Sequence, residues 1–228
     1  MTVEDYAALA FFVLIWWLFN WLTDRRRTFT RMSLTRAMAI HRERWIRNSL
    51  RRDLKMIDTQ IISGLQNGTA FFASTAIFAL GGCFALLGST EQIEALFADL
   101  PHFFRGGRTA FELKIGGLAA MFGYSYFKFG WAYRLFNYCS ILFGTIPMTD
   151  DARSDPEGAH SAAQKVIDIN IIAATNFNDG LRATFLSIGY LGWFVSPYVF
   201  MLVTVVVFLV LLRRQFFSDA RDVLVRDL

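Results

Sequence analysis

Hydrophobic residues in this chain are collected in long runs that carry no charge, and they do not alternate regularly with polar ones. Residues 6–23 form the first run, 32 uncharged residues lie between Asp58 and Glu91, and 30 lie between Arg182 and Arg213. An ionised side chain at the centre of a bilayer costs about 2.5–3.5 kcal/mol, and about 20 apolar residues cross the hydrocarbon core as a helix. The runs therefore predict membrane-spanning helices at about 5–23, 65–88 and 183–212.

A less regular stretch, residues 110–146, is apolar and aromatic but contains three basic residues. Its glycines recur at steps of seven or a multiple of seven, which places them close to one face of a continuous helix. They are Gly116, Gly123, Gly130 and Gly144. Small residues let a second helix approach closely in lipid, so this face is predicted to be a packing seam. We predict one helix over 112–144, of which 112–134 spans the membrane; two shorter helices broken near Gly130 are the alternative.

The distribution of lysine and arginine sets the expected orientation. Residues 24–60 carry 11 of the 23 basic residues, which makes this segment cytoplasmic under the positive-inside rule. The N-terminus is then outside, the loop and helix of residues 147–182 are cytoplasmic, and four crossings place the C-terminus outside. Arg213 and Arg214 argue against the last point, and an odd number of crossings would remove the conflict.

The predicted fold class is therefore all-α. We expect a polytopic membrane helical bundle that forms a single domain over residues 1–228, with four transmembrane helices and additional amphipathic cytoplasmic helices.

The basic segment 24–60 also has a helical pattern. Apolar residues at steps of three and four, from Ile46 to Ile61, form one stripe on an otherwise basic helix. Such a helix lies at the anionic cytoplasmic surface, where each basic residue contributes about 1 kcal/mol of attraction. The residues expected to contact lipid headgroups are Arg44, Arg47, Arg51, Arg52 and Lys55. Membrane lipids are thus expected partners, whereas nucleic acid is not, because no groove with interleaved aromatic residues argues for it.

Several polar side chains remain that a membrane does not tolerate without partners. By the expected topology they all approach the cytoplasmic boundary. They are Gln66, Lys128, Arg134, Asn137, Asn176, Asp179 and Arg182. We expect a polar cluster there, in which Asp179 pairs with Lys128 or Arg134. The alternative is that Lys128 and Arg134 reach the headgroups singly.

Composition narrows the functional classes. The chain is 54% hydrophobic and 18% charged and has two cysteines, which excludes a disordered chain and a disulfide scaffold. His41, His102 and His160 stand apart, so no metal site is predicted. The H-E-x-x-H, G-x-S-x-G and phosphate-binding glycine patterns are missing from the sequence. No cofactor is therefore expected, and catalysis is disfavoured.

Three stretches carry a resemblance to a known family. They are QNGTAFFASTAIFALGGCFALLG at 66–88, FKFGWAYRLFNYCSILFGTIP at 127–147 and NFNDGLRATFLSIGYLGWFVSP at 176–197. In content and order they resemble the integral membrane group called domain-of-unknown-function family 599, over most of residues 5–212. The resemblance implies a multi-span membrane protein of a kind found in bacteria and plants, and we expect the bacterial inner (plasma) membrane. It supplies no reaction, ligand or catalytic residue.

These observations favour an integral membrane protein that is a homo-oligomeric channel or a transporter of an ion or small solute, with the polar cluster near the cytoplasmic boundary. Four spans are few for a monomeric carrier, so copies of the chain would have to build the path. The alternative is a non-catalytic accessory or scaffold subunit of a larger membrane complex. A membrane-embedded enzyme acting on a lipid or quinone is a third possibility.

Overall fold

The computed structural model describes the chain except for residues 25–30, 91–106 and 227. Every regular element in the described part is helical, which confirms the all-α class there. In chain order the elements are α1 (Val3–Asp24), α2 (Leu34–Ser49), α3 (Met56–Gly88), α5 (Gly107–Phe143), α6 (Thr149–Ser154), α7 (Pro156–Leu191), the 3-10 helix η1 (Gly192–Phe194), α8 (Pro197–Phe216) and α9 (Asp219–Val225).

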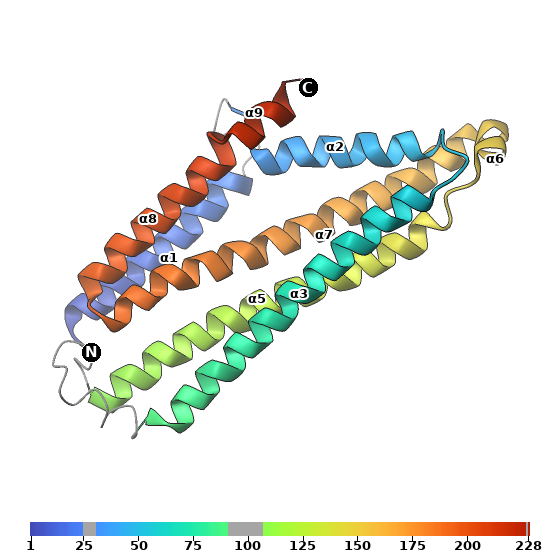
Figure 1. Ribbon diagram of the computed structural model, residues 1–228. Helices are drawn as coiled ribbons and strands as arrows, with labels where there is room; N and C mark the ends of the chain where they lie inside the picture. The colour runs from blue at the N-terminus through green and yellow to red at the C-terminus, as the bar shows by residue number, and fades with distance from the viewer. Residues whose placement is uncertain (25–30, 91–106, 227) are drawn as a thin grey trace.

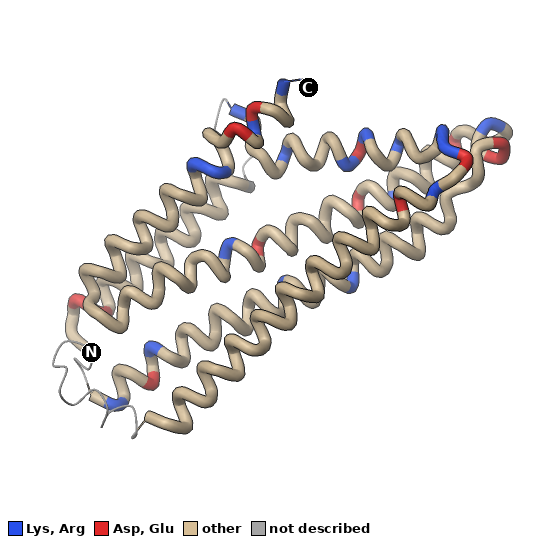
Figure 2. The backbone as a smooth tube through the Cα atoms, viewed as in Figure 1, with Lys and Arg blue, Asp and Glu red and all other residues tan. Residues whose placement is uncertain are grey.

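Three helical stretches are long and apolar enough to cross a membrane. They are Val3–Thr23 in α1, Met56–Gly88 in α3, and Pro197–Val225, which comprises α8 and α9. Large apolar side chains on them point outward, as Phe78 (79% exposed) and Leu202 (65% exposed) illustrate. Figure 2 shows long stretches without charged positions on these helices. Lipid tails solvate such a surface well. In water, by contrast, each Å² of apolar surface left exposed is about 25 cal/mol less favourable than the same surface when buried.

The longest helices run side by side. α5 packs along α3 and along α7, and the three share one direction in space (Figure 1). They contain 33, 37 and 36 residues for α3, α5 and α7. At 1.5 Å per residue each is about 50–55 Å long, which exceeds a hydrocarbon core of about 30 Å. α5 continues through Gly130 without a break.

Between α7 and α8 the chain turns back, within the segment that was predicted to be a single span. An added Cβ at Gly192 would lie 3.1 Å from the Phe200 Cα, so the two helices approach closely at the turn and glycine is favoured there. Ser196 Oγ then accepts the Val199 N–H at 3.1 Å, and Pro197 occupies the first turn of α8, where no N–H partner is needed. The 183–212 segment is therefore two antiparallel helices (Figure 1) and not one helix.

This reversal returns the end of the chain to α2. Gln215 Nε2 donates to Thr35 Oγ1 at 2.8 Å, and Arg221 Nε donates to the Met32 carbonyl at 2.8 Å. The expected topology put the C-terminus on the side opposite to the basic segment, and these contacts contradict it.

The glycine row predicted as a packing seam on α5 faces open space within this chain. An added Cβ at Gly116, Gly123 or Gly130 would meet nothing within 4 Å. At Gly144 it would meet only backbone carbonyls of the preceding turn, the nearest at 3.2 Å. Steps of seven define one face of a helix, but they do not determine which neighbour covers that face.

The close approaches use other glycines: Gly117 of α5, where an added Cβ would overlap Tyr190 Oη, and glycines of α7. An added Cβ at Gly180 would lie 2.6 Å from the ring of Phe129 on α5. That ring is 1% exposed and is held between Phe72 and Phe177, with centroid distances of 5.6 Å to each. Because the ring has no room to retreat, α5 and α7 can approach this closely only with glycine at this position.

We predict that Gly180→Ala lowers the thermal unfolding midpoint of the detergent-solubilised protein by about 2–6 °C. Overpacking costs about 1–3 kcal/mol, which outweighs the gain of about 1 kcal/mol from replacing glycine by alanine in a helix. Gly123→Ala adds the same methyl group where there is space, and it should not lower the midpoint. Equal losses in the two variants, measured by circular dichroism on heating, would contradict the packing of α7.

Candidate anion-binding site

The polar residues expected to cluster separate in the structure, and the first group joins α5 to α7. Lys128 Nζ lies 3.0 Å from Asp179 Oδ2 and 3.1 Å from Asn176 Oδ1. Arg182 Nη1 lies 3.3 Å from Asp179 Oδ1. Asn176, Asp179 and Arg182 follow one another at steps of three, which places them on one face of α7. A single carboxylate therefore faces two cations.

The other expected members lie elsewhere. Gln66 Nε2 donates to Asn137 Oδ1 at 2.8 Å and so links α3 to α5. Arg134 belongs to neither group, because its Nε donates to Tyr138 Oη at 2.6 Å on the exposed face of α5. Its guanidinium also lies over the Trp131 ring, 6.0 Å from the centroid. Asp179 is thus the partner of Lys128 and not of Arg134.

The basic row expected to contact headgroups is partly engaged within the protein. Arg47 Nε pairs with Glu43 Oε1 at 2.8 Å. Arg52 Nη1 pairs at 2.5 Å with Asp58, a fully buried carboxylate that also accepts the Trp45 indole N–H at 2.7 Å. The chain leaves helical geometry between α2 and α3, so the predicted apolar stripe from Ile46 to Ile61 is not one continuous helix.

Lys55, which lies between α2 and α3, also bonds to groups within the protein. Its Nζ donates to the carbonyls of Ile146 and Pro147 at 3.0 and 2.7 Å. Burial lowers the pKa of Lys55, and the nearby Asp58 opposes this shift. Arg44 and Arg51 are the exposed members of the row.

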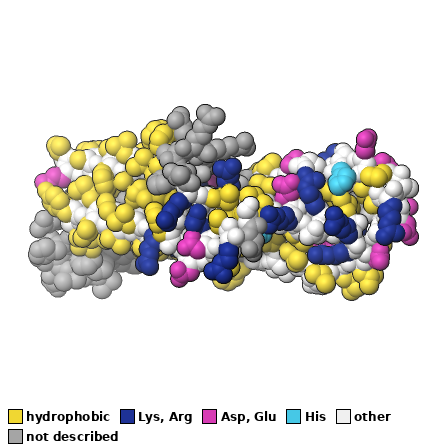
Figure 3. Space-filling view, turned by 90° about the horizontal axis from the view of Figure 1, so that it is seen from above, with side chains coloured by type: hydrophobic (Ala, Val, Ile, Leu, Met, Phe, Trp, Pro, Cys, Tyr) yellow, Lys and Arg dark blue, Asp and Glu magenta, His cyan; other side chains and the backbone are white. Residues whose placement is uncertain are grey.

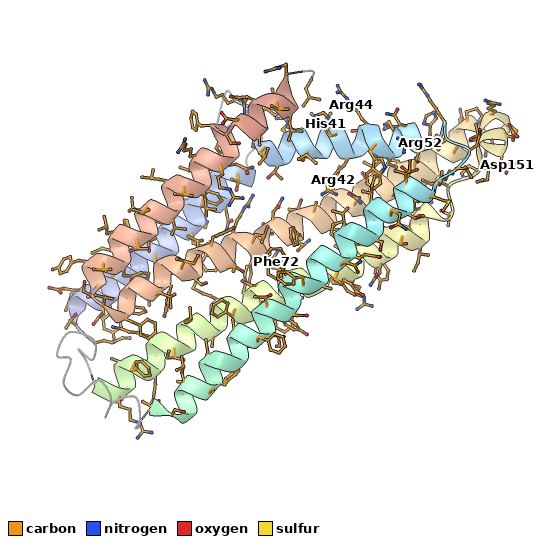
Figure 4. The ribbon with its side chains drawn as sticks, viewed as in Figure 1. His41, Arg42, Arg44, Arg52, Phe72 and Asp151 are labelled. Atoms are coloured by element: carbon orange, nitrogen blue, oxygen red, sulfur yellow. The ribbon has the colours of Figure 1, made fainter. Side chains whose placement is uncertain are left out.

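One arginine of α2 that the sequence analysis did not single out has a different environment. Arg42 extends from α2 toward α7, and Arg44 lies on the other side of α2 (Figure 4). Arg42 Nη1 donates to Asn170 Oδ1 at 2.5 Å. Asn170 is fully buried, and its amide donates to Cys139 Sγ at 3.4 Å. Burial lowers the pKa of Arg42, yet a guanidinium is basic enough to stay charged. A neutral amide therefore holds this cation.

Arg42 is part of the wall of a cavity of about 330 Å³ where α2 meets α3, α7 and the ends of α1 and α8. The other polar residues in its wall are Arg182, Arg214, Thr35, Thr69, Thr175, Asn178 and Gln215. The remaining wall is glycine and apolar side chains, among them Phe19, Phe136, Phe177 and Phe185. Among the described residues no Asp or Glu lines it.

The charge around this cavity is only partly compensated. Arg214 lies over the Phe185 ring at 5.3 Å, and Arg182 lies over the Phe19 ring at 5.4 Å. Within the described part of the chain, Arg42 and Arg214 form no ion pair. Asp179 contacts both Lys128 and Arg182. A space-filling view from above shows Lys and Arg gathered over the half of the face where α2 lies (Figure 3). The cavity is therefore a positively charged site with largely apolar walls.

The structure places the molecule in a class: an all-helical protein with three helical stretches able to cross a membrane and an arginine-lined cavity beside them. The chain belongs to the family described as Protein of unknown function, DUF599, whose profile matches residues 7–220. This confirms the family indicated by the three sequence stretches. Comparison with curated proteins and with solved structures found no match. Among the described residues no group of three His, Cys, Asp or Glu is placed to hold a metal ion.

We predict that Lys128→Ala and Asp179→Ala are coupled, so that the double variant loses about 0.5–3 kcal/mol less than the two single losses added together. Each single change removes one ion-pair contact, so that Asp179 keeps Arg182 and Lys128 keeps the Asn176 amide. The Lys128 and Asp179 side chains are only 27% and 22% exposed. Asp168→Ala removes a carboxylate from the exposed face of the same helix and should show no coupling to Lys128→Ala. Thermal unfolding of all variants in one detergent measures this, and purely additive losses for the first pair would contradict the contact.

Proposed function

We propose that this chain is an integral membrane protein with five crossings that binds an anion in the arginine-lined cavity at its cytoplasmic boundary. The observation that carries the proposal is the wall of that cavity, to which Arg42, Arg182 and Arg214 contribute and no described Asp or Glu does. Of the three, Arg42 is partly buried and held by a neutral amide, Arg182 contacts Asp179, and Arg214 is exposed. A cation that is partly removed from water without an opposite charge is unfavourable, and an anionic ligand that accepts hydrogen bonds from guanidinium groups would offset this cost at Arg42.

Five crossings follow if α5 and α7 join the three apolar stretches. Both are long enough and pack between α3 and α8. Their interior charges have partners at the end near η1 as well: Lys114 Nζ donates to the Trp193 carbonyl at 2.9 Å, and Trp193 Nε1 donates to Asp5 Oδ1 at 2.8 Å. Charges with polar partners are those that a membrane interior tolerates.

This topology also agrees with the distribution of basic residues. Segments 25–55, 144–155 and 217–228 lie outside the five crossing helices, fall on one side and carry eleven, one and two basic residues. Segment 89–111, on the other side, carries two. The positive-inside rule then assigns α2, α6 and α9 to the cytoplasm and the N-terminus to the outside.

A homo-oligomeric channel or transporter is the second candidate. It is favoured by the row Gly116, Gly123 and Gly130, which faces open space that the helix of another copy could approach. An accessory or scaffold subunit would present the same face to a different membrane protein. The native mass of the gently solubilised protein separates the two, because a homo-oligomer has a mass that is a multiple of this chain, whereas a subunit travels with a larger complex at a fixed ratio.

Native mass spectrometry of the protein extracted gently from its own membrane tests the anion site. We predict that the wild type retains an anionic small molecule and that the double variant Arg42→Gln, Arg214→Gln releases it, since both changes remove cavity cations. The matched control is Arg36→Gln, Arg51→Gln, which removes the same charge from exposed positions and should retain the molecule. A wild type without a bound anion, or retention by all three proteins, would contradict the proposal.

A further inference from the structure

Resting on the anion site proposed above, we infer that its ligand is an anionic amphiphile. Its acidic group lies among the arginines, and its apolar chain lies along the aromatic wall of the same cavity. The shared chemistry is a phosphate or carboxylate group, and a lipid of the cytoplasmic leaflet is the source to which the apolar wall points.

The two kinds of wall residue come from different elements. Thr35 and Arg42 belong to α2, and Arg214 and Gln215 belong to the end of α8 that contacts it. The aromatic members lie on α1, α5 and α7, where Phe19 and Phe185 belong to one hydrophobic cluster, Phe136 to another, and Phe177 packs against Phe72 and Phe129. A ligand that satisfies both surfaces has one charged end and one apolar end, whereas a free inorganic anion would leave part of its oxygens against rings and unsolvated.

α7 also supplies polar groups that can bind the acidic end of the ligand. Thr175, Asn178 and Arg182 follow at steps of three and four, so they form one polar strip on the face that borders the cavity. The Asn178 side chain makes no hydrogen bond to a described residue. Its amide N–H groups are therefore free to donate to a ligand, together with the guanidinium of Arg42.

The size of the cavity is consistent with a ligand that has one acidic end and one apolar chain. A volume of about 330 Å³ lies at the lower end of the range of about 300–1,000 Å³ that small-molecule pockets have. Such a space is suited to an acidic group and the first part of one chain and is small for a whole two-chain lipid. The remainder of the chain would continue into the lipid that surrounds the exposed apolar faces of the helices.

Removing the Arg42 charge leaves α2 attached, because other contacts hold both of its ends. Thr35 is bound to Gln215 at 2.8 Å near the start of α2, and Arg47 is bound to Gln164 at 2.9 Å near its end. Arg42→Gln is therefore a suitable probe of the ligand, and Arg51→Gln is a control at an exposed position with the same loss of charge.

The test uses the full chain in nanodiscs of phosphatidylcholine and follows the thermal unfolding midpoint. Three probes are compared: phosphatidic acid in the bilayer, diacylglycerol in the bilayer at the same fraction, and inorganic phosphate in solution. Ligands that bind the folded state raise the midpoint. Phosphatidic acid is expected to raise the midpoint of the wild type and of Arg51→Gln, with at least a tenfold higher half-saturating fraction in Arg42→Gln. Diacylglycerol and inorganic phosphate are expected to cause no shift.

Other outcomes overturn the inference in distinguishable ways. An equal shift with inorganic phosphate would show that the site binds free anions. That result would overturn the inference of an amphiphilic ligand but would leave the proposed anion site intact. An equal shift with diacylglycerol would show that the arginines do not recognise a negative charge. That result would overturn both the amphiphilic ligand and the proposed anion site. An equal loss in Arg42→Gln and Arg51→Gln would assign the effect to the general surface charge. No shift with any probe would overturn the amphiphile alone if the wild type still retains an anion in native mass spectrometry.

Discussion

α7 contacts α2, α5, α6 and α8, and glycines on it allow α5 and α8 to come close. Gly180 admits the Phe129 ring of α5, and Gly189 admits the backbone of α8, where an added Cβ would lie 3.2 Å from the Thr204 Cα. Close-packed interiors leave no slack for an extra methyl group at such points. The positions of the polar side chains follow from this packing, since it sets Asp179 against Lys128 and leaves Asn170 in reach of α2.

Charged side chains in the interior have different kinds of partner in different parts of the molecule. At the end near η1, the Lys114 ammonium is held by the Trp193 carbonyl, and the Trp193 indole binds Asp5. Between α5 and α7, Asp179 pairs with Lys128. At the cavity, by contrast, Arg42 is held by a neutral amide. Charged groups that are removed from water require compensation, and the contrast within one chain is the reason to assign a ligand to this place.

Much of the helical architecture could be predicted from runs without charge, because the cost of a charge in lipid is large compared with any local propensity. The reversal near Gly192 could not be predicted that way, since hydropathy continues unchanged through it. The signal was local: a glycine followed by Ser196 and Pro197 is a helix stop and a new start. The glycine spacing on α5 likewise predicted which residues share one face of the helix, but not which element packs against that face. The glycines of α7 that make close contacts have no regular spacing, so a periodic pattern could not reveal them.

The candidate site was only partly visible in the sequence. Asp179, Lys128 and Arg182 stand out because they are charged residues in apolar surroundings. Arg42 does not stand out, because it lies among other basic residues of a cytoplasmic segment and only the tertiary structure turns it toward α7. A weaker signal was present in Asn170, a single amide within an apolar part of α7, since a buried amide needs a partner from another element.

The cavity exists only if the α7–α8 reversal brings the end of α8 back to α2, and labelling of single cysteines tests this most directly. The variants Thr2→Cys, Asn48→Cys and Asp219→Cys place a thiol at exposed positions of the N-terminus, α2 and α9, while the native Cys83 and Cys139 are buried. A membrane-impermeant maleimide is added to either face of sealed vesicles. The structure predicts that positions 48 and 219 react from the same face and that position 2 reacts from the opposite face. Reaction of position 219 from the face where position 2 reacts would contradict the reversal, and with it the arginine-lined cavity.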